Sequence, residues 1–170
     1  MMPDFLDPVA LLDDAAERLE QARKLEDVEA VVRTTARRLV QADGATFVLL
    51  EGDQCYYADE DSMSPLWKGQ RFRATECISG WSMFHHQTAV IPDIRYDERI
   101  PQAAYQPTFV RSLIMAPMLA PKAVGAIGVY WARWHSGTDD EVSVLEKLAE
   151  LAGQAVERFP HGLPDPGFQI

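Results

Sequence analysis

The sequence is poor in cysteine and in basic residues, and it has no long apolar run. Cys55 and Cys77 are the only 2 cysteines among 170 residues, whereas a secreted disulfide scaffold usually has more of them at closer spacing. No apolar stretch approaches the roughly 18 residues that a transmembrane helix requires. The first residues are acidic and lack the basic start of a signal peptide. These absences predict a cytoplasmic protein in a reducing compartment.

Basic residues are too few for two common classes of partner. The chain has 16 Lys and Arg against 26 Asp and Glu, which gives a formal net charge of -10. Nucleic acids and anionic membrane surfaces both bind clustered basic side chains, so neither is an expected partner. Glycine-rich phosphate loops, Ser/His/Asp triads and HExxH motifs are also missing. We therefore expect no catalytic activity from this chain itself.

Three stretches have apolar residues at helical spacing and begin at residues that cap helices well. Asp7 and Pro8 start the first stretch, Asp27 caps the second, and the sequence TDDE from Thr138 forms a capping box before the third. Gly44 suits the end of the second helix. The pattern therefore predicts helices over residues 7–24, 27–43 and 138–159.

Runs of β-branched and aromatic residues predict the strands. Short turns after residues 50 and 119 make two antiparallel hairpins. A fourth helix is predicted over residues 78–86, and the long polar connection over residues 93–105 is of a kind that often has a function. The element order predicts an α+β domain with a central antiparallel sheet. Its strands are expected at residues 45–50, 54–58, 71–75, 89–92, 112–119 and 124–132.

Three parts of the sequence resemble the GAF family in content and order. GAF domains often show a Gly-Trp helix start and then a short strand that ends in Asp, as in ISGW (78–81) followed by AVIPD (89–93). The second part is DERIP (97–101) followed by VRSLIMAPM (110–118), and the third is GAIGVYW (125–131). The wording of the middle part most resembles GAF domains of bacterial sensor histidine kinases.

The resemblance implies a GAF-like fold, with the N- and C-terminal helices on one face of the sheet and a helix–loop pocket on the other. Aromatic side chains would supply contact area in this pocket, and a few polar groups would orient a ligand. Residues on regularly spaced elements can instead belong to the core, as is the alternative for Trp81, Phe84 and Met115. The resemblance identifies no ligand or cofactor. Carried onto this chain, the pocket residues are Trp81, Phe84, His85, Asp93, Tyr96, Tyr105, Phe109 and Met115.

Several more specialised chemistries of GAF domains are not supported by these residues. His85 and His86 are adjacent on a helix and point in different directions, so we expect no metal site there. Neither cysteine precedes a histidine, as covalent bilin attachment would require, and the signature of cyclic-nucleotide binding is missing. Cys55 and Cys77 could form a redox pair, but two ordinary semi-buried thiols are the simpler expectation.

The resemblance therefore implies a sensory or regulatory GAF domain of a bacterial signal-transduction protein, most like a sensor histidine kinase. A small ligand or a partner would bind the pocket, and the terminal helices would relay the change to a kinase effector and pair in a homodimer. Two alternatives remain: a stand-alone redox enzyme of the methionine-sulfoxide-reductase type, and a structural dimerisation module. The chain divides into an N-terminal amphipathic helix (1–26), the GAF-like sensory domain (27–159) and a Pro/Gly-rich tail (160–170).

Overall fold

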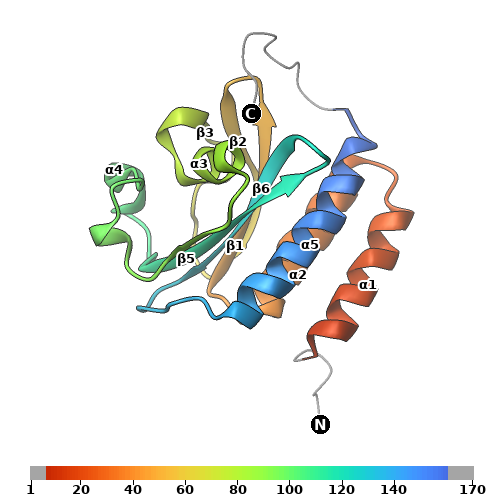
Figure 1. The fold of residues 1–170 in the computed structure, drawn as a ribbon, viewed down its shortest axis with the longest axis horizontal. Coiled ribbons are helices and arrows are strands. Elements are labelled where there is room, and N and C mark those ends of the chain that lie inside the picture. The colour runs from red at the N-terminus through yellow and green to blue at the C-terminus, as the bar shows by residue number, and fades with distance from the viewer. Residues whose placement is uncertain (1–6, 161–170) are drawn as a thin grey trace.

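An antiparallel sheet forms the centre of the structure, a computed structural model that describes residues 7–160 (Figure 1). Its strands are β1 (Gly44–Glu51), β2 (Gln54–Ser62), β3 (Arg71–Arg73), β4 (Ala89–Ile91), β5 (Ser112–Leu119) and β6 (Ala123–Trp131). The strand order is β3-β2-β1-β6-β5-β4, and every neighbouring pair is antiparallel. This arrangement confirms the predicted α+β fold with a central antiparallel sheet.

Three long helices cover one face of this sheet. They are α1 (Pro8–Gln21), α2 (Leu25–Leu39) and α5 (Asp139–Glu157). α2 and α5 lie against the sheet, and α1 packs on the outer side of both (Figure 1). The apolar stripe of α1 is therefore largely covered within one chain, through the buried residues Leu11, Ala15 and Leu19.

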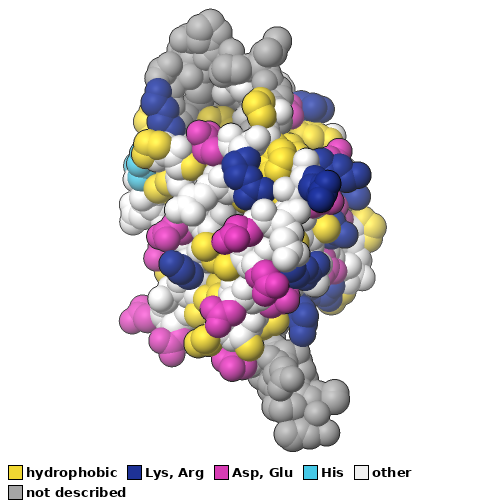
Figure 2. Space-filling model, turned by 90° about the vertical axis from the view of Figure 1, so that its right-hand side faces the viewer, with side chains coloured by type: hydrophobic (Ala, Val, Ile, Leu, Met, Phe, Trp, Pro, Cys, Tyr) yellow, Lys and Arg dark blue, Asp and Glu magenta, His cyan; other side chains and the backbone are white. Residues whose placement is uncertain are grey.

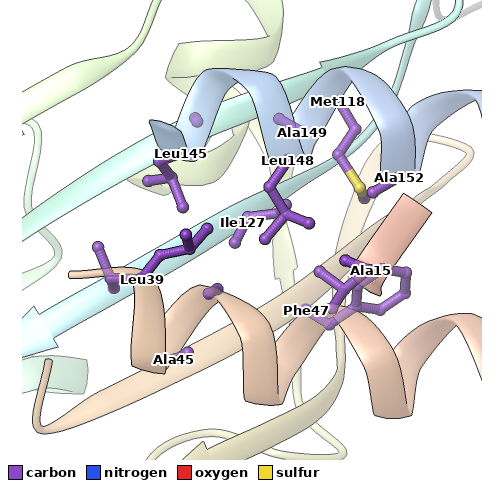
Figure 3. Close-up of a cluster of buried hydrophobic side chains, with 14 of the residues drawn as sticks. Ala15, Leu39, Ala45, Phe47, Met118, Ile127, Leu145, Leu148, Ala149 and Ala152 are labelled. Atoms are coloured by element: carbon purple, nitrogen blue, oxygen red, sulfur yellow. The ribbon is translucent and has the colours of Figure 1, made fainter. Parts of the chain in front are cut away.

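The core under these helices is made of aliphatic and aromatic side chains. Leu148 of α5, Leu39 of α2, and Phe47 and Ile127 of the sheet belong to one buried cluster (Figure 3). Such interiors are close-packed, so α2 and α5 lie in direct contact with the sheet. On the outer face that α1 and α5 form, hydrophobic side chains are interspersed with acidic and basic ones (Figure 2).

The opposite face of the sheet is covered by short elements. These are η2 (Ala74–Glu76), α3 (Ile78–His85), η3 (Ile94–Tyr96) and the single turn α4 (Gln102–Tyr105). They confirm the expected helix–loop cover on this face (Figure 1). The connection over residues 93–105 contains η3 and α4, and the Gln102 side chain joins them by donating a hydrogen bond from Nε2 to the carbonyl of Ile94 at 2.8 Å.

β2 is longer than predicted because its second half pairs with charges on α2. The sequence predicts that this strand ends at Ala58, since polar and acidic residues of low strand propensity follow. Asp59 forms an ion pair with Arg33, and Asp61 forms one with Arg37 at 2.9 Å. The register with β1 shifts at Ala58, which is a β-bulge. Side chains beyond the bulge therefore change faces, and Asp59 points towards α2.

Two other expectations differ from the structure or lie outside it. α2 begins at Leu25, before Asp27, because the Asp27 carboxylate accepts hydrogen bonds from the backbone N–H groups of Arg23 and Lys24 at 2.9 and 3.2 Å. Apart from Pro160, the predicted tail lies outside the described residues. Within residues 7–160, no helix has the length and apolar character needed to cross a membrane.

The charges between α2 and β2 lead to a pH-dependent prediction at Glu29. Burial raises the pKa of this half-buried carboxyl to about 7, and the negative charge of Asp59 adds to the effect. The folded-state pKa lies above the unfolded value of about 4.5, so the ionised form destabilises the fold, and this penalty grows as the pH rises between the two values. Glu29→Gln is therefore expected to raise the unfolding temperature at pH 8 and to leave it nearly unchanged at pH 4.

Thermal denaturation followed by circular dichroism at these two pH values measures the effect. Glu20→Gln on α1 is the matched control, because Glu20 is exposed and its replacement is expected to change little at either pH. An equal shift of Glu29→Gln at both pH values would contradict a titration of Glu29 in this range.

Candidate functional site

The start of α3 forms the wall of several cavities on the loop-covered face. Cys77 is the residue before α3, and η2 approaches this helix closely from the preceding turn. Gly80 permits the approach, because a Cβ at this position would lie 1.7 Å from the carbonyl oxygen of Ala74. The Gly-Trp pair in the sequence therefore has a physical role, since Gly80 admits the backbone and Trp81 projects beside it.

Two surface clefts of about 230 Å3 each flank Trp81. The Trp81 ring stacks on His85 with ring centroids 4.5 Å apart, and the guanidinium of Arg99 lies 4.3 Å from its centroid. Cys77 and Thr75 line both clefts. The first cleft also contains Ala74, Gly80, Phe84 and His85, and the second contains Glu76, Glu98, Arg99, Ile100 and Pro101.

A third, internal pocket lies between the sheet and α4. The space between its lining side chains has no room for a water-sized molecule. Trp67 forms part of its wall, with its ring centroid 4.5 Å from that of Tyr105 and 5.6 Å from that of Tyr57. The pocket is lined by Tyr57, Trp67, Phe72, Cys77, Pro101, Ala104 and Tyr105.

Trp67 is fixed in this pocket by hydrogen bonds at both ends. Its indole Nε1 donates to the carbonyl of Ala104 at 2.9 Å. The carboxylate of Glu60 accepts bonds from the backbone N–H groups of Leu66, Trp67 and Lys68, each at 3.0 Å. Charge-assisted bonds of this kind are stronger than neutral ones, so Glu60 holds the whole turn that carries the indole.

The Tyr105 hydroxyl is the exception in this well-bonded region. It is buried and has no hydrogen-bond partner among the residues that the structure describes. Burial, and then the nearby Tyr130, raise its pKa well above the ordinary value, so it stays protonated. Because an unpaired buried hydroxyl costs about 1–3 kcal/mol, a polar group that reached this oxygen would gain stability there.

The two cysteines meet beside this pocket. Cys77 Sγ lies 3.3 Å from the hydroxyl of Ser79, which in turn lies 3.0 Å from the hydroxyl of Tyr57. A hydrogen bond with the Cys55 thiol is the main cause that lowers the pKa of Cys77 to about 7, although burial acts against it. The same bond and burial raise the pKa of Cys55. The sequence predicts two ordinary semi-buried thiols, with a redox pair as the alternative, and the structure places both thiols in one buried cluster.

The structure does not gather the eight predicted pocket residues around one cavity. Trp81, Phe84 and His85 share one surface cleft, although Phe84 is 59% exposed. Tyr105 lines the internal pocket instead. Met115 is fully buried in the core, as its alternative interpretation held, and Tyr96 is 81% exposed. Phe109 is half-buried, near Gly44.

Asp93 acts as a structural link rather than as a free pocket carboxylate. Its oxygens accept hydrogen bonds from Arg95 at 2.9 Å and from Arg111 at 3.1 Å. The Arg95 hydrogen bond is the main reason that the pKa of Asp93 lies well below its usual range. The carboxylate therefore remains ionised and paired, and it connects η3 to the start of β5.

Four residues of these cavities were absent from the predicted set. Trp67 stands in a polar stretch of the sequence, and Cys77 stands directly before the Gly-Trp motif, which is a usable signal. Tyr57 follows Cys55 at the two-residue period that places both on one face of β2. Nothing in the sequence indicates a role for Arg99 in the site, because its contact with Trp81 depends on how the connection over residues 93–105 folds back.

Known proteins share the fold of this chain. A family model described as GAF domain matches residues 25–157. The GAF domain of an Acinetobacter phosphoenolpyruvate-protein phosphotransferase superposes with a TM-score of 0.77 at 13% identity, over 89% of this chain and 93% of that one. Among curated proteins, no sequence matches this chain.

Two further structures share the architecture but differ in their chemistry. A free methionine-R-sulfoxide reductase from Neisseria meningitidis has a TM-score of 0.72 at 17% identity, over 88% of each chain. A far-red cyanobacteriochrome photoreceptor has a TM-score of 0.70 at 15% identity, over 89% of this chain and 96% of that one. At such identities the likeness shows the fold alone.

Proposed function

Because this chain belongs to the GAF domain family, we propose that it is a regulatory domain that binds a small molecule under the α3–α4 cover. The observation that carries this proposal is the buried Tyr105 hydroxyl without a partner among residues 7–160. Buried polar groups are nearly always paired, and this one lies among aromatic rings that suit a flat ligand. A planar molecule with one hydroxyl or ring nitrogen has the matching chemistry.

Binding requires that the cover open, since the internal pocket has no room for a water-sized molecule. α4 is a single turn, and short elements of this kind open locally at low cost. The surface clefts beside Trp81 lead to the same wall, because Cys77 and Pro101 line both the second cleft and the internal pocket. A ligand therefore has a path from solvent to Tyr105 along this wall.

We expect phenol, catechol or indole, tested as probes, to raise the unfolding temperature of the chain and to give a one-to-one complex in native mass spectrometry. Tyr105→Phe should keep the fold and bind the same probe about 10-fold more weakly, because one hydrogen bond is worth about 1 kcal/mol or slightly more. Tyr96→Phe, at an exposed tyrosine, is the matched control and should bind as the unaltered chain does. Equal binding by Tyr105→Phe, or binding of none of the three probes, counts against this site.

We further propose that α1, α2 and α5 relay the change, that they pair in a homodimer, and that the effector is a histidine kinase in the cytoplasm. The packing of α2 and α5 on the sheet supports the relay, and the resemblance of residues 97–118 supports the kinase. Val9 of α1 is 66% exposed and is available for an intersubunit contact. Light scattering tests the dimer, and a mass of one chain at high micromolar concentration would exclude it.

A redox enzyme is the second candidate, because Cys77 lines the cavities and Cys55 lies in the same buried cluster. Its test is the reduction of free methionine sulfoxide with dithiothreitol as the electron donor. Activity that disappears in Cys77→Ser would support a reductase, and no activity in the unaltered chain would exclude it. A chain that neither binds the probes nor reduces the sulfoxide, but dimerises, fits the structural module.

A further inference from the structure

The two thiols differ in their access to solvent. Cys77 lines both surface clefts and the internal pocket, and it is 6% exposed. Cys55 lies on β2 with no exposed surface and lines none of these three cavities. A small molecule that enters either cleft therefore reaches Cys77 first.

They differ also in how easily they ionise. The Ser79 hydroxyl and the backbone N–H groups of Ser79 and Gly80 hydrogen-bond to Cys77 and, together with the Cys55 thiol, lower its pKa to about 7. Cys77 therefore ionises more readily than an ordinary thiol, and the thiolate is the form of cysteine that reacts. Cys55 has its pKa raised and remains a neutral thiol beside it.

We propose that Cys55 and Cys77 form an oxidisable pair, in which a hydroperoxide reacts at Cys77 and Cys55 then closes an intramolecular disulfide. Three features of the structure support it: the location of both thiols in one buried cluster, the access of Cys77 through two clefts, and the Ser79 hydroxyl 3.3 Å from Cys77 Sγ. One accessible thiol with a neutral thiol behind it is the arrangement in which an oxidised cysteine is resolved rather than overoxidised.

The reaction balances in two steps. The Cys77 thiolate attacks one oxygen of the hydroperoxide, the O–O bond breaks, and the other oxygen leaves with a proton as an alcohol, or as water when the oxidant is hydrogen peroxide. The sulfur of Cys55 then attacks the sulfenic sulfur of Cys77, an S–S bond forms, and the hydroxyl leaves as water. Together the two thiols give up two electrons and two protons, and the peroxide takes them.

This chemistry goes beyond the proposed ligand binding and does not depend on it. A disulfide would join β2 to the start of α3, which is the wall that the three cavities share. Oxidation would therefore act on the same wall as a ligand, by forming a disulfide bond there instead of occupying a pocket. Loss of probe binding in Tyr105→Phe would leave the oxidation unchanged, so the two proposals fail separately.

The test treats the reduced full-length chain with a small molar excess of hydrogen peroxide at pH 7. The expected product is a monomeric chain lighter by two hydrogen atoms, in which peptide mapping joins residue 55 to residue 77. In Cys55→Ser the sulfenic acid on Cys77 persists and is trapped by dimedone. In Cys77→Ser the buried Cys55 should react at least 10-fold more slowly than Cys77 does in the unaltered chain.

Circular dichroism verifies the fold of each variant, and Cys55→Ala and Cys77→Ala replace any serine variant that does not fold. The rate of Cys77 alkylation by iodoacetamide, measured in the unaltered chain against pH, should have its midpoint near pH 7. Trapping of two separate sulfenic acids in the unaltered chain, or disulfides only between chains, overturns the proposal. The proposal is also overturned if Cys77 does not react with peroxide, or if the midpoint of its alkylation lies above about pH 8.

Discussion

Trp67→Ala is expected to lower the free energy of unfolding by about 3–5 kcal/mol, the usual loss for a large aromatic side chain removed from a core. Trp67 is 3% exposed and packs against Tyr57, Tyr105 and Tyr130. Its removal also frees the carbonyl of Ala104, which accepts the indole N–H. Urea denaturation followed by tyrosine fluorescence and circular dichroism measures the loss.

The same variant tests whether the internal pocket can hold a ligand. The space left by the indole is lined by aromatic rings, and such apolar cavities bind small aromatic molecules. Free indole should therefore restore part of the lost stability of Trp67→Ala. Trp134→Ala, at a tryptophan that is 58% exposed, is the matched control and should change stability by no more than about 0.5 kcal/mol. If indole restored no stability to Trp67→Ala, or if Trp67→Ala and Trp134→Ala lost the same stability, the assignment of Trp67 to the pocket would be contradicted.

Gly80→Ala is expected to cost about 3 kcal/mol or more, because relief of a backbone clash needs movement of the main chain. The added methyl would lie 1.7 Å from the carbonyl oxygen of Ala74, and no side chain can move to relieve it. η2 would then separate from α3, and the clefts beside Trp81 would lose their shape. Chemical denaturation gives the loss, and intrinsic tryptophan fluorescence of the folded variant reports on Trp81.

Gly69→Ala separates this clash from ordinary backbone strain. Gly69 has a φ of +90° and no atom within 4 Å of an added Cβ, so its replacement strains the backbone without a collision. A loss of about 1–2 kcal/mol is expected there, clearly smaller than that of Gly80→Ala. If the two alanine variants lost the same free energy, the close approach at Gly80 would not be the cause.

The features predicted well from the sequence are those set by neighbouring residues. The hairpin of β1 and β2 follows from the turn at residues 51–53, and α5 begins at the capping box whose Thr138 hydroxyl accepts from the backbone N–H of Glu141. The rings of Trp81 and His85 stack on each other because residues four apart on a helix share a face. In each case a local spacing decides the geometry.

The features predicted poorly depend on contacts between distant residues. The end of β2 requires the arginines of α2, 24 and 26 residues away in the sequence. Tyr105 and Met115 were placed in one pocket with Tyr96, but their depth depends on how the connection over residues 93–105 folds back onto the sheet. Cys55 and Cys77 meet only because β2 and the start of α3 pack together, which no spacing of 22 residues indicates.

The bulge at Ala58 gives β2 a role in both halves of the molecule. Before it, Cys55 and Tyr57 belong to the buried cluster on the loop-covered face, and after it, Asp59 pairs with Arg33 on α2. β2 thus contacts both the buried cluster beside the proposed ligand pocket and α2, the helix that would carry the signal. If occupancy of the cavities changes the strength of the Asp59–Arg33 pair, thermodynamic reciprocity requires that loss of this pair changes ligand affinity by the same factor. Arg33→Lys would then be a substitution on the opposite face of the sheet that alters binding without touching the site.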